Sequence, residues 1–206
     1  MFISYPEMAE IIAIIFDNNI YSQNQDFLPN RYFIQRNVII SIINKIFDVQ
    51  TESKIGLFPI CQEIKNKIIT PTDNKQQLMN FIYNCDLCKN ENLFLAFFQA
   101  DQALQLTELT SKKLIIFLSS PITNFGHMIY ILSNVAQKNI EMKIICFGDA
   151  IHFGNMASQE LQMDNIQFLI ITSSNYIEDK IYDFLTDNEY DDPELREALQ
   201  KSIIER

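Results

Sequence analysis

The stretch Ile11-Ile-Ala-Ile-Ile-Phe-Asp-Asn-Asn19 decides the fold of this chain. Six apolar residues follow one another without a charge, and one acid and two amides then end the run. A short, continuous apolar run that stops at turn-forming residues is typical of a strand buried on both faces of a parallel sheet. A second run, Leu114–Leu118, stops at Ser119-Ser-Pro121 in the same way. We therefore expect two central strands whose polar ends meet at one edge of a sheet.

Extended and helical patterns alternate along the rest of the chain. Strands are predicted at Ile11–Phe16, Lys54–Ile60, Lys67–Thr70, Leu114–Leu118, Lys143–Phe147 and Gln167–Thr172. Helices are predicted at Pro29–Phe47, Asn74–Tyr83, Leu93–Leu106, His127–Gln137, about 155–163 and Tyr176–Leu185. This alternation predicts an α/β fold with a doubly wound, mostly parallel six-stranded sheet and helices on both faces. The hairpin-like pair near 54–70 predicts one antiparallel edge.

The net charge of −10 is concentrated near the end of the 206 residues. Ten acids and four bases lie between Glu178 and Arg206. Such a segment repels phosphate backbones, so we expect no nucleic-acid partner. No uncharged apolar stretch reaches about 18 residues, and no basic leader precedes a small-residue cleavage site, so we expect no membrane partner. The expected location is the cytoplasm and nucleus.

Motifs for catalysis are missing from the loops. The four glycines form neither GxGxxG nor GxxxxGK[ST], and GxSxG is also absent, so we expect no enzyme activity and no cofactor. Cys85-Asp-Leu-Cys88 has no second pair to complete a zinc site, and free thiols are the expected state. His127 and His152 are isolated in the sequence.

The last residues carry a second pattern, Asp192-Pro-Glu-Leu-Arg-Glu-Ala-Leu-Gln-Lys-Ser-Ile-Ile-Glu-Arg206. Helical spacing places one apolar or small face on this segment, made by Leu195, Ala198, Leu199 and Ser202. Pro193 suits the start of a helix, and the neighbouring acids suit the positive end of its dipole. Either this helix packs on its own domain, or another protein approaches it closely at Ala198.

Landmarks spread over the chain carry a family resemblance. They are Asp17-Asn18, Asp26–Arg31, Ile55–Leu57, Thr70–Asp73, Phe117–Pro121, Phe147–Asp149 and the segment from Asp192 to Ser202. In order and spacing the chain resembles a short, divergent member of the ubiquitin-receptor subunits of the 26S proteasome regulatory particle. Members of that family join a von Willebrand A domain to a ubiquitin-interacting motif (UIM).

The resemblance implies a division of the chain into a von Willebrand A domain at 1–186, an acidic linker at 187–192 and a UIM helix at 193–206. It implies a non-catalytic subunit that docks on proteasome lid and base subunits and binds ubiquitin on polyubiquitinated substrates. The implied ubiquitin-binding residues are Asp191, Asp192, Glu194, Leu195, Ala198, Leu199, Ser202 and Glu205. The alternatives are a scaffold subunit of a transcription or repair complex, with the terminal helix packed internally, and a metal-dependent adhesion domain.

The metal site of von Willebrand A domains is degenerate in this chain. That site needs Asp-x-Ser-x-Ser after the first strand, because hydroxyl and carboxylate oxygens hold a hard cation. The run here is Asp17-Asn-Asn19-Ile-Tyr21, which lacks both serines. We therefore predict no metal at Asp17 and Asn19, and we expect Asp17 to cap loop amides instead. The segment Glu91–Phe98 is also more apolar than the resemblance would suggest.

Overall fold

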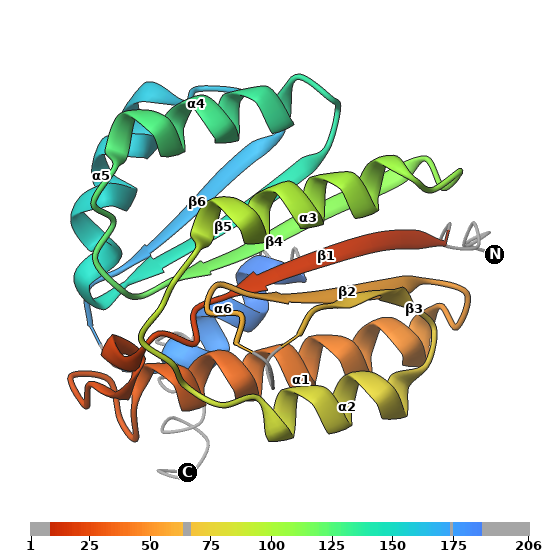
Figure 1. The fold of residues 1–206 in the computed structure, drawn as a ribbon, viewed down its shortest axis with the longest axis horizontal. Helices are drawn as coiled ribbons and strands as arrows, with labels where there is room; N and C mark the ends of the chain where they lie inside the picture. The colour runs from red at the N-terminus through yellow and green to blue at the C-terminus, as the bar shows by residue number, and fades with distance from the viewer. Residues whose placement is uncertain (1–8, 64–66, 174, 187–206) are drawn as a thin grey trace, which may run out of the picture.

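A computed structural model describes residues 9–63, 67–173 and 175–186. These residues form one six-stranded sheet with helices on both faces (Figure 1). Its strands are β1 (Glu10–Phe16), β2 (Lys54–Pro59), β3 (Ile69–Thr72), β4 (Ser111–Leu118), β5 (Glu141–Phe147) and β6 (Ile166–Ile171). The helices are α1 (Arg31–Val49), α2 (Lys75–Asn84), α3 (Leu93–Gln105), α4 (Phe125–Ala136), α5 (Ile151–Glu160) and α6 (Ile177–Leu185). Short 3-10 turns occupy Ile20–Gln23 and Gly148–Ala150.

The strand order is β3-β2-β1-β4-β5-β6, and every neighbouring pair is parallel except the β2–β3 pair. The predicted doubly wound sheet with one antiparallel edge is thus confirmed. The chain moves from β1 outward to β2 on one side, and later returns to place β4 on the other side of β1. The strand order therefore reverses between β1 and β4, and α/β folds place their functional crevice at the carboxyl end of such a switch point.

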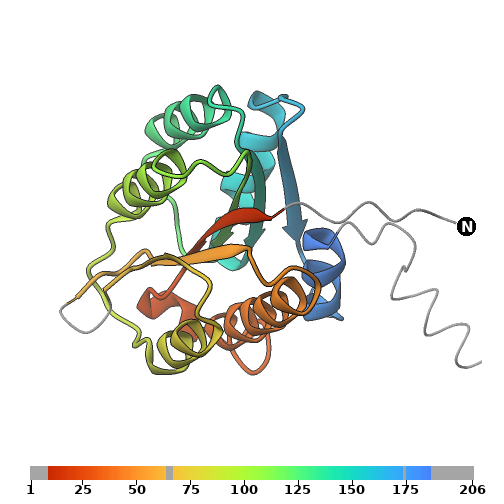
Figure 2. The ribbon, with the colours of Figure 1, turned by 90° about the vertical axis from the view of Figure 1, so that its right-hand side faces the viewer.

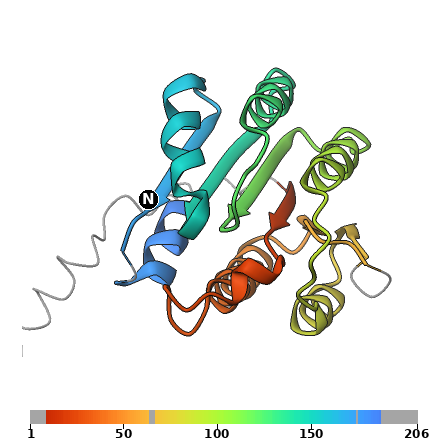
Figure 3. The same cartoon turned by 60° about the vertical axis from the view of Figure 1, so that its left-hand side comes forward.

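Alternating side chains of each central strand enter two different cores. On β1, Ile11, Ala13 and Ile15 pack with α3, α4 and α5, while Ile12, Ile14 and Phe16 pack with α1, α2 and α6. The period of two is the normal geometry of a strand, and here both faces are covered. Figures 2 and 3 show the sheet between these two helical layers. This arrangement explains why Ile11–Phe16 and Leu114–Leu118 are apolar throughout.

Asparagine residues begin four of the helices. The side chains of Asn30, Asn74, Asn92 and Asn124 each accept a hydrogen bond from the backbone N–H three residues later. Such caps satisfy one of the N–H groups that the first helical turn leaves without a partner. These caps fix the starts of α1, α2, α3 and α4 within two residues of the predicted positions.

The fifth helix differs from its prediction. The periodicity suggested about 155–163, whereas α5 spans Ile151–Glu160. It begins directly after the turn Gly148–Ala150, and its N-cap residue Ala150 has no side-chain cap. The usual sequence signal for a helix start is therefore missing at this position. None of the helices in the described ranges is long and apolar enough to span a bilayer.

Candidate functional site

Polar residues from β1 and β4 meet at the switch point. Asp17 directly follows β1, and Ser119 and Ser120 directly follow β4. Ile15 of β1 lies opposite Ile116 of β4, so the two strands end side by side at the same edge of the sheet. Parallel pairing thus brings together residues that are about a hundred positions apart in the chain.

The carboxylate of Asp17 is saturated with hydrogen bonds. Its Oδ2 accepts from the backbone N–H groups of Ser119 (3.0 Å) and Ser120 (2.7 Å) and from the Ser119 hydroxyl (3.0 Å). Its Oδ1 accepts from the backbone N–H of Asn19 (3.0 Å) and from the Ser120 hydroxyl (3.0 Å). The side chain is only 1% exposed. Asp17 therefore caps loop amides, the role that the sequence suggested.

This arrangement does not fit a divalent cation. All five donors occupy the lone pairs that Asp17 would offer to a metal, and the two serine hydroxyls direct their protons at the same carboxylate. In magnesium and calcium sites the cation has six or more oxygen ligands, at roughly 2.0–2.6 Å. Within the described ranges no group of three or more His, Cys, Asp or Glu side chains could hold a metal ion.

A buried guanidinium lies beside this cluster. Arg31 forms two hydrogen bonds with the Asp26 carboxylate (2.8 and 2.6 Å). It donates two more, to the Ser119 carbonyl (2.6 Å) and to the Asp149 carboxylate (2.8 Å). Its side chain is 3% exposed, and the hydrogen bonds that it donates lower the pKa of Asp26 below the ordinary value. One cation from α1 thus links the loops that follow β4 and β5.

Gly148 makes room for that cation. Its φ is +60°, and a Cβ at this position would overlap the Arg31 guanidinium. The positive φ strains any residue with a side chain, and the overlap adds to that strain. A glycine is therefore required here by two independent conditions.

Gln35 completes the connection between α1 and the strand ends. Its Oε1 accepts from the backbone N–H of Asp17 (2.9 Å), and its Nε2 donates to the Asp17 carbonyl (3.2 Å) and the Ser119 hydroxyl (3.3 Å). The roles of Arg31 and Gln35 were not predicted from the sequence. A signal existed, because both share a helical face with buried Val38 and Ile42. Polar residues on a buried face need partners, and this pair indicated a polar cluster.

Asn18 fixes two further loops. Its side-chain amide donates to the carbonyls of Cys61 and Asp86 (both 3.0 Å) and accepts from the Cys61 N–H (2.8 Å). The four cysteines are free and buried, as expected for the CxxC pair. Burial raises the pKa of Cys85 to about 12, so this thiol stays protonated at neutral pH.

A small cavity of about 200 Å³ opens at the same edge of the sheet. It is lined mainly by apolar residues of the loop after β4 and of α3 and α4, with Asp17, Ser120 and Glu91 on its polar side. Asn19 donates to the Glu91 carboxylate at 2.6 Å. Partial burial raises the pKa of Glu91 above its ordinary value, and the negative charge of Asp17 raises it further. Drug-sized ligands occupy roughly 300–1,000 Å³, so this cavity suits only a smaller group.

The unexpectedly apolar segment Glu91–Phe98 is divided between the core and the surface. It forms the start of α3, where Ala96 and Phe97 are buried. Leu95 is 37% exposed and Phe98 62% exposed on the outer side of the same helix. Part of the apolar character thus serves packing, and part faces outward.

The predicted ubiquitin-binding residues lie outside the described residues. All eight fall between 191 and 205, after the end of α6 at Leu185 and the last described residue, Thr186. Their assignment, like the division of the chain at 186 and 192, stays a prediction.

Comparisons with known proteins agree on the fold. No protein-family model matches the chain. It is 21% identical over 145 residues to a 26S proteasome non-ATPase regulatory subunit 4 homolog of Oryza sativa subsp. japonica, across 69% of this chain and 36% of that protein. The chain thus spans about a third of the length of this curated relative.

Comparison with solved structures identifies the fold. The crystal structure of the SpRpn10 VWA domain superposes with a TM-score of 0.68 at 21% identity, covering 87% of this chain and 95% of that domain. An aerotolerance-related membrane protein of Bacteroides fragilis superposes with a TM-score of 0.65 at 10% identity, covering 87% of this chain and 100% of that one. The described residues therefore have a von Willebrand A fold; the chain is similar in sequence to the rice proteasome subunit homolog and in fold to the SpRpn10 VWA domain.

Replacing Gly148 tests the packing around Arg31. Gly148→Ala should lower the free energy of unfolding by more than about 2 kcal/mol, because it combines a positive φ with an overlap on the guanidinium. The matched control is Gly126→Ala, which lies in α4 and whose Cβ would meet nothing within 4 Å. Its free energy of unfolding should stay unchanged or rise by up to about 1 kcal/mol, because alanine favours a helix more than glycine does. Chemical denaturation measures both; equal stability of the two variants would contradict the packing described.

The Asp26–Arg31 pair predicts a dependence of stability on pH. The pKa of Asp26 is lower in the folded state than its value of 3.8 in the unfolded chain. The ionised carboxylate therefore adds fully to the free energy of unfolding above pH 3.8, and this stabilisation is lost as the pH falls through the pKa of the folded state. Asp26→Asn should therefore lower the melting temperature at pH 7 and have a smaller effect below about pH 3.8. Asp48→Asn, which breaks an exposed pair with Lys75, is the control and should change little at either pH. A pH-independent effect of Asp26→Asn would argue against the ion pair.

Proposed function

We propose that this protein is a non-catalytic subunit of the proteasome regulatory particle. In this proposal its von Willebrand A domain docks at the contact between lid and base, and a single UIM at 193–206 binds ubiquitin on substrates for degradation. The proposed subunit acts in the cytoplasm and nucleus, and its function involves no cofactor, nucleic acid or membrane.

The sequence match to the rice proteasome subunit homolog carries the proposal. It covers 69% of this chain, and the independent structural match to the SpRpn10 VWA domain extends over 87%. The UIM-like pattern adds further support, because it follows the last helix of the domain after a short acidic segment.

The closed edge of the sheet supports a docking role over a catalytic one. Asp17, Arg31 and Gln35 direct their polar atoms at neighbouring loops, and none of them needs a ligand to complete its hydrogen bonds. A catalytic group would have to be within hydrogen-bond reach of a substrate. The network instead holds the loops in fixed positions, which suits a surface that another subunit recognises.

The terminal segment would bind ubiquitin through its small and apolar face. Leu195, Ala198 and Leu199 would make the apolar contact, and Ser202 would contribute a hydrogen bond. The flanking acids Asp191, Asp192, Glu194 and Glu205 would pair with basic groups around the ubiquitin patch, which affects on-rate and register more than affinity.

A single helix gives weak binding. Its interface would be at or below the small end of stable complexes, under about 1,200 Å². Useful capture then depends on several ubiquitin units in one chain and on other receptors held by the same particle. The proposal therefore expects modest affinity for one ubiquitin and much tighter retention of polyubiquitinated substrates.

Affinity purification tests the docking part. Tagged protein expressed in its native cells should bring down lid and base subunits of the proteasome in comparable amounts. Recovery of a transcription or repair complex, with no proteasome subunits, would replace the proposal with the scaffold alternative.

A charge substitution tests the ubiquitin part. Ala198→Asp should weaken ubiquitin binding at least about tenfold, because it desolvates a carboxylate inside an apolar contact. Gln200→Asp adds the same charge on the other side of the helix and should bind nearly as the unmodified chain does. NMR titration with ubiquitin measures both, and an unchanged melting temperature confirms that the domain stays folded. Equal binding by the two variants would remove 193–206 as the ubiquitin site.

A further inference from the structure

Two helices on one face of the sheet differ greatly in length. α1 has 19 residues and α6 has 9, which corresponds to about 28 Å and about 14 Å at 1.5 Å per residue. Both run from the carboxyl edge of the sheet toward its amino edge, and they contact each other on the same face. α6 ends at Leu185, so within the described ranges the last turns of α1 have no helical neighbour on that side.

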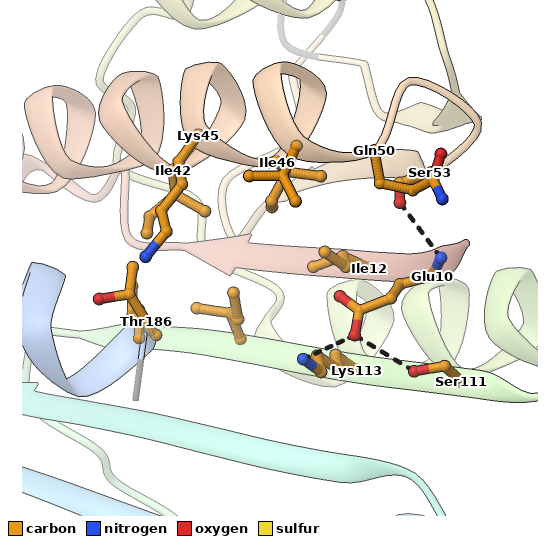
Figure 4. Close-up of a pocket in the computed structure, with 13 residues that line it drawn as sticks. Glu10, Ile12, Ile42, Lys45, Ile46, Gln50, Ser53, Ser111, Lys113 and Thr186 are labelled. Carbon is orange, nitrogen blue, oxygen red and sulfur yellow. Dashed lines mark hydrogen bonds and ion pairs between the residues drawn. The ribbon is translucent and has the colours of Figure 1, made fainter. Parts of the chain in front are cut away.

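A cleft of about 430 Å³ occupies the space beyond the end of α6 (Figure 4). Ile12 of β1 and Ile115 of β4 form its floor. Ile46 and Val49 of α1 form one wall, and Leu185 lies at the end of α6. Val49 is 56% exposed. The cleft thus has an apolar floor and apolar walls over the two central strands, and a polar rim that includes Glu10, Lys45 and Lys113.

The polar groups on the rim already have partners. Glu10 pairs with Lys113 at 2.8 Å and accepts from the Ser111 hydroxyl at 3.4 Å, and its backbone N–H donates to the Ser53 hydroxyl at 3.2 Å. Lys45 extends from α1 toward Thr186 and lies 5.5 Å from the centre of the Tyr182 ring. An occupant of this cleft would gain little from polar groups of its own, so the cleft favours apolar side chains.

Residues 1–8 carry mostly apolar side chains, which is the kind of side chain that this cleft favours. They join the described chain at Ala9, next to Glu10, which lines the cleft. Their sequence holds one charge, Glu7, and five large apolar side chains: Met1, Phe2, Ile3, Tyr5 and Met8. Eight residues reach at most about 29 Å, which is enough to cross the cleft from its rim.

Residues 187–206 fit the cleft less well, although they also start beside it. They carry seven acids and three bases. The adjoining surface between α1 and α6 already holds Asp48, Glu178 and Asp179, with Lys45 as the one base lining it. Bringing the acidic segment there would place like charges together.

We propose that residues 1–8 fold back from Ala9 into the cleft between α1 and α6 and cover Ile46, Val49 and Leu185 with their apolar side chains. The segment would take the position that a longer α6 would fill in this layer. It would also leave residues 193–206 clear of the domain, although the proposal does not depend on any function of those residues.

Methyl NMR of the full chain tests the proposal. A variant with Phe2, Ile3, Tyr5 and Met8 all replaced by Ser should shift the methyl signals of Ile46, Val49 and Leu185 and lower the melting temperature. The signals of Ile129 and Ile131 on α4, across the sheet, should stay in place and report an intact fold. The matched control Ser4→Ala with Glu7→Gln should move neither group of signals. Unmoved cleft signals in the four-serine variant would overturn the proposal.

A spin label gives an independent measurement without changing the segment. The four native thiols are buried, so a label attached to Asp48→Cys marks the outer side of α1 beside the cleft. It should broaden the methyl signals of Met1 and Ile3, which lie far from Ala9 unless the segment folds back, whereas a label on Phe98→Cys, on the opposite helical layer, should not. Broadening of the Ile203 and Ile204 signals in place of Met1 and Ile3 would mean that the C-terminal segment occupies the cleft, and the proposal would then be wrong.

Discussion

The hydrogen bonds from the Ser119 and Ser120 amides to the Asp17 carboxylate are the constraint on which this structure depends. They join the ends of β1 and β4 at the point where the strand order reverses. A buried carboxylate needs full compensation, and five donors supply it here. Because Asp17 is fixed in this way, Gln35 can bridge its backbone to α1, and the Ser119 carbonyl is placed to accept from Arg31.

This chain lacks the Asp-x-Ser-x-Ser motif of metal-binding von Willebrand A domains, and side chains join the loops at this edge of the sheet. The positive charge comes from Arg31, and Asp26 and Asp149 balance it. Both acids are partly exposed, so the arrangement avoids the full desolvation of three charges, which can exceed the gain of pairing them. Unlike a metal ion, a guanidinium has no coordination position to exchange, so the loops keep one geometry. That property agrees with the docking role proposed above.

Much of this architecture follows from the sequence, for physical reasons that differ between elements. Strands buried on both faces must be apolar throughout, which made Ile11–Phe16 and Leu114–Leu118 recognisable. Apolar periodicity placed the starts of α1, α2, α3 and α4 within two residues, and asparagine caps that the structure shows at these starts were a signal not used; α5 was misplaced, and Ala150 offers no such cap. The Arg31 cluster escaped prediction because its partners Ser119 and Asp149 are brought near only by the strand order. The sequence patterns predicted a long helix near α1 and a short one near α6, but the cleft also depends on the two helices lying side by side on one face of the sheet, which no local pattern encodes.

The two helical layers differ in one more respect. Within α3, α4 and α5 the only Asp, Glu, Lys or Arg residues are Asp101 and Glu160, whereas α1, α2 and α6 together hold five bases and four acids. The surface of the first layer is therefore poor in charge, and Phe98 and Tyr130 are exposed on it. Because burying a charge costs more free energy than burying an apolar ring, a neighbouring protein would lose less solvation on the α3, α4 and α5 layer than on the other.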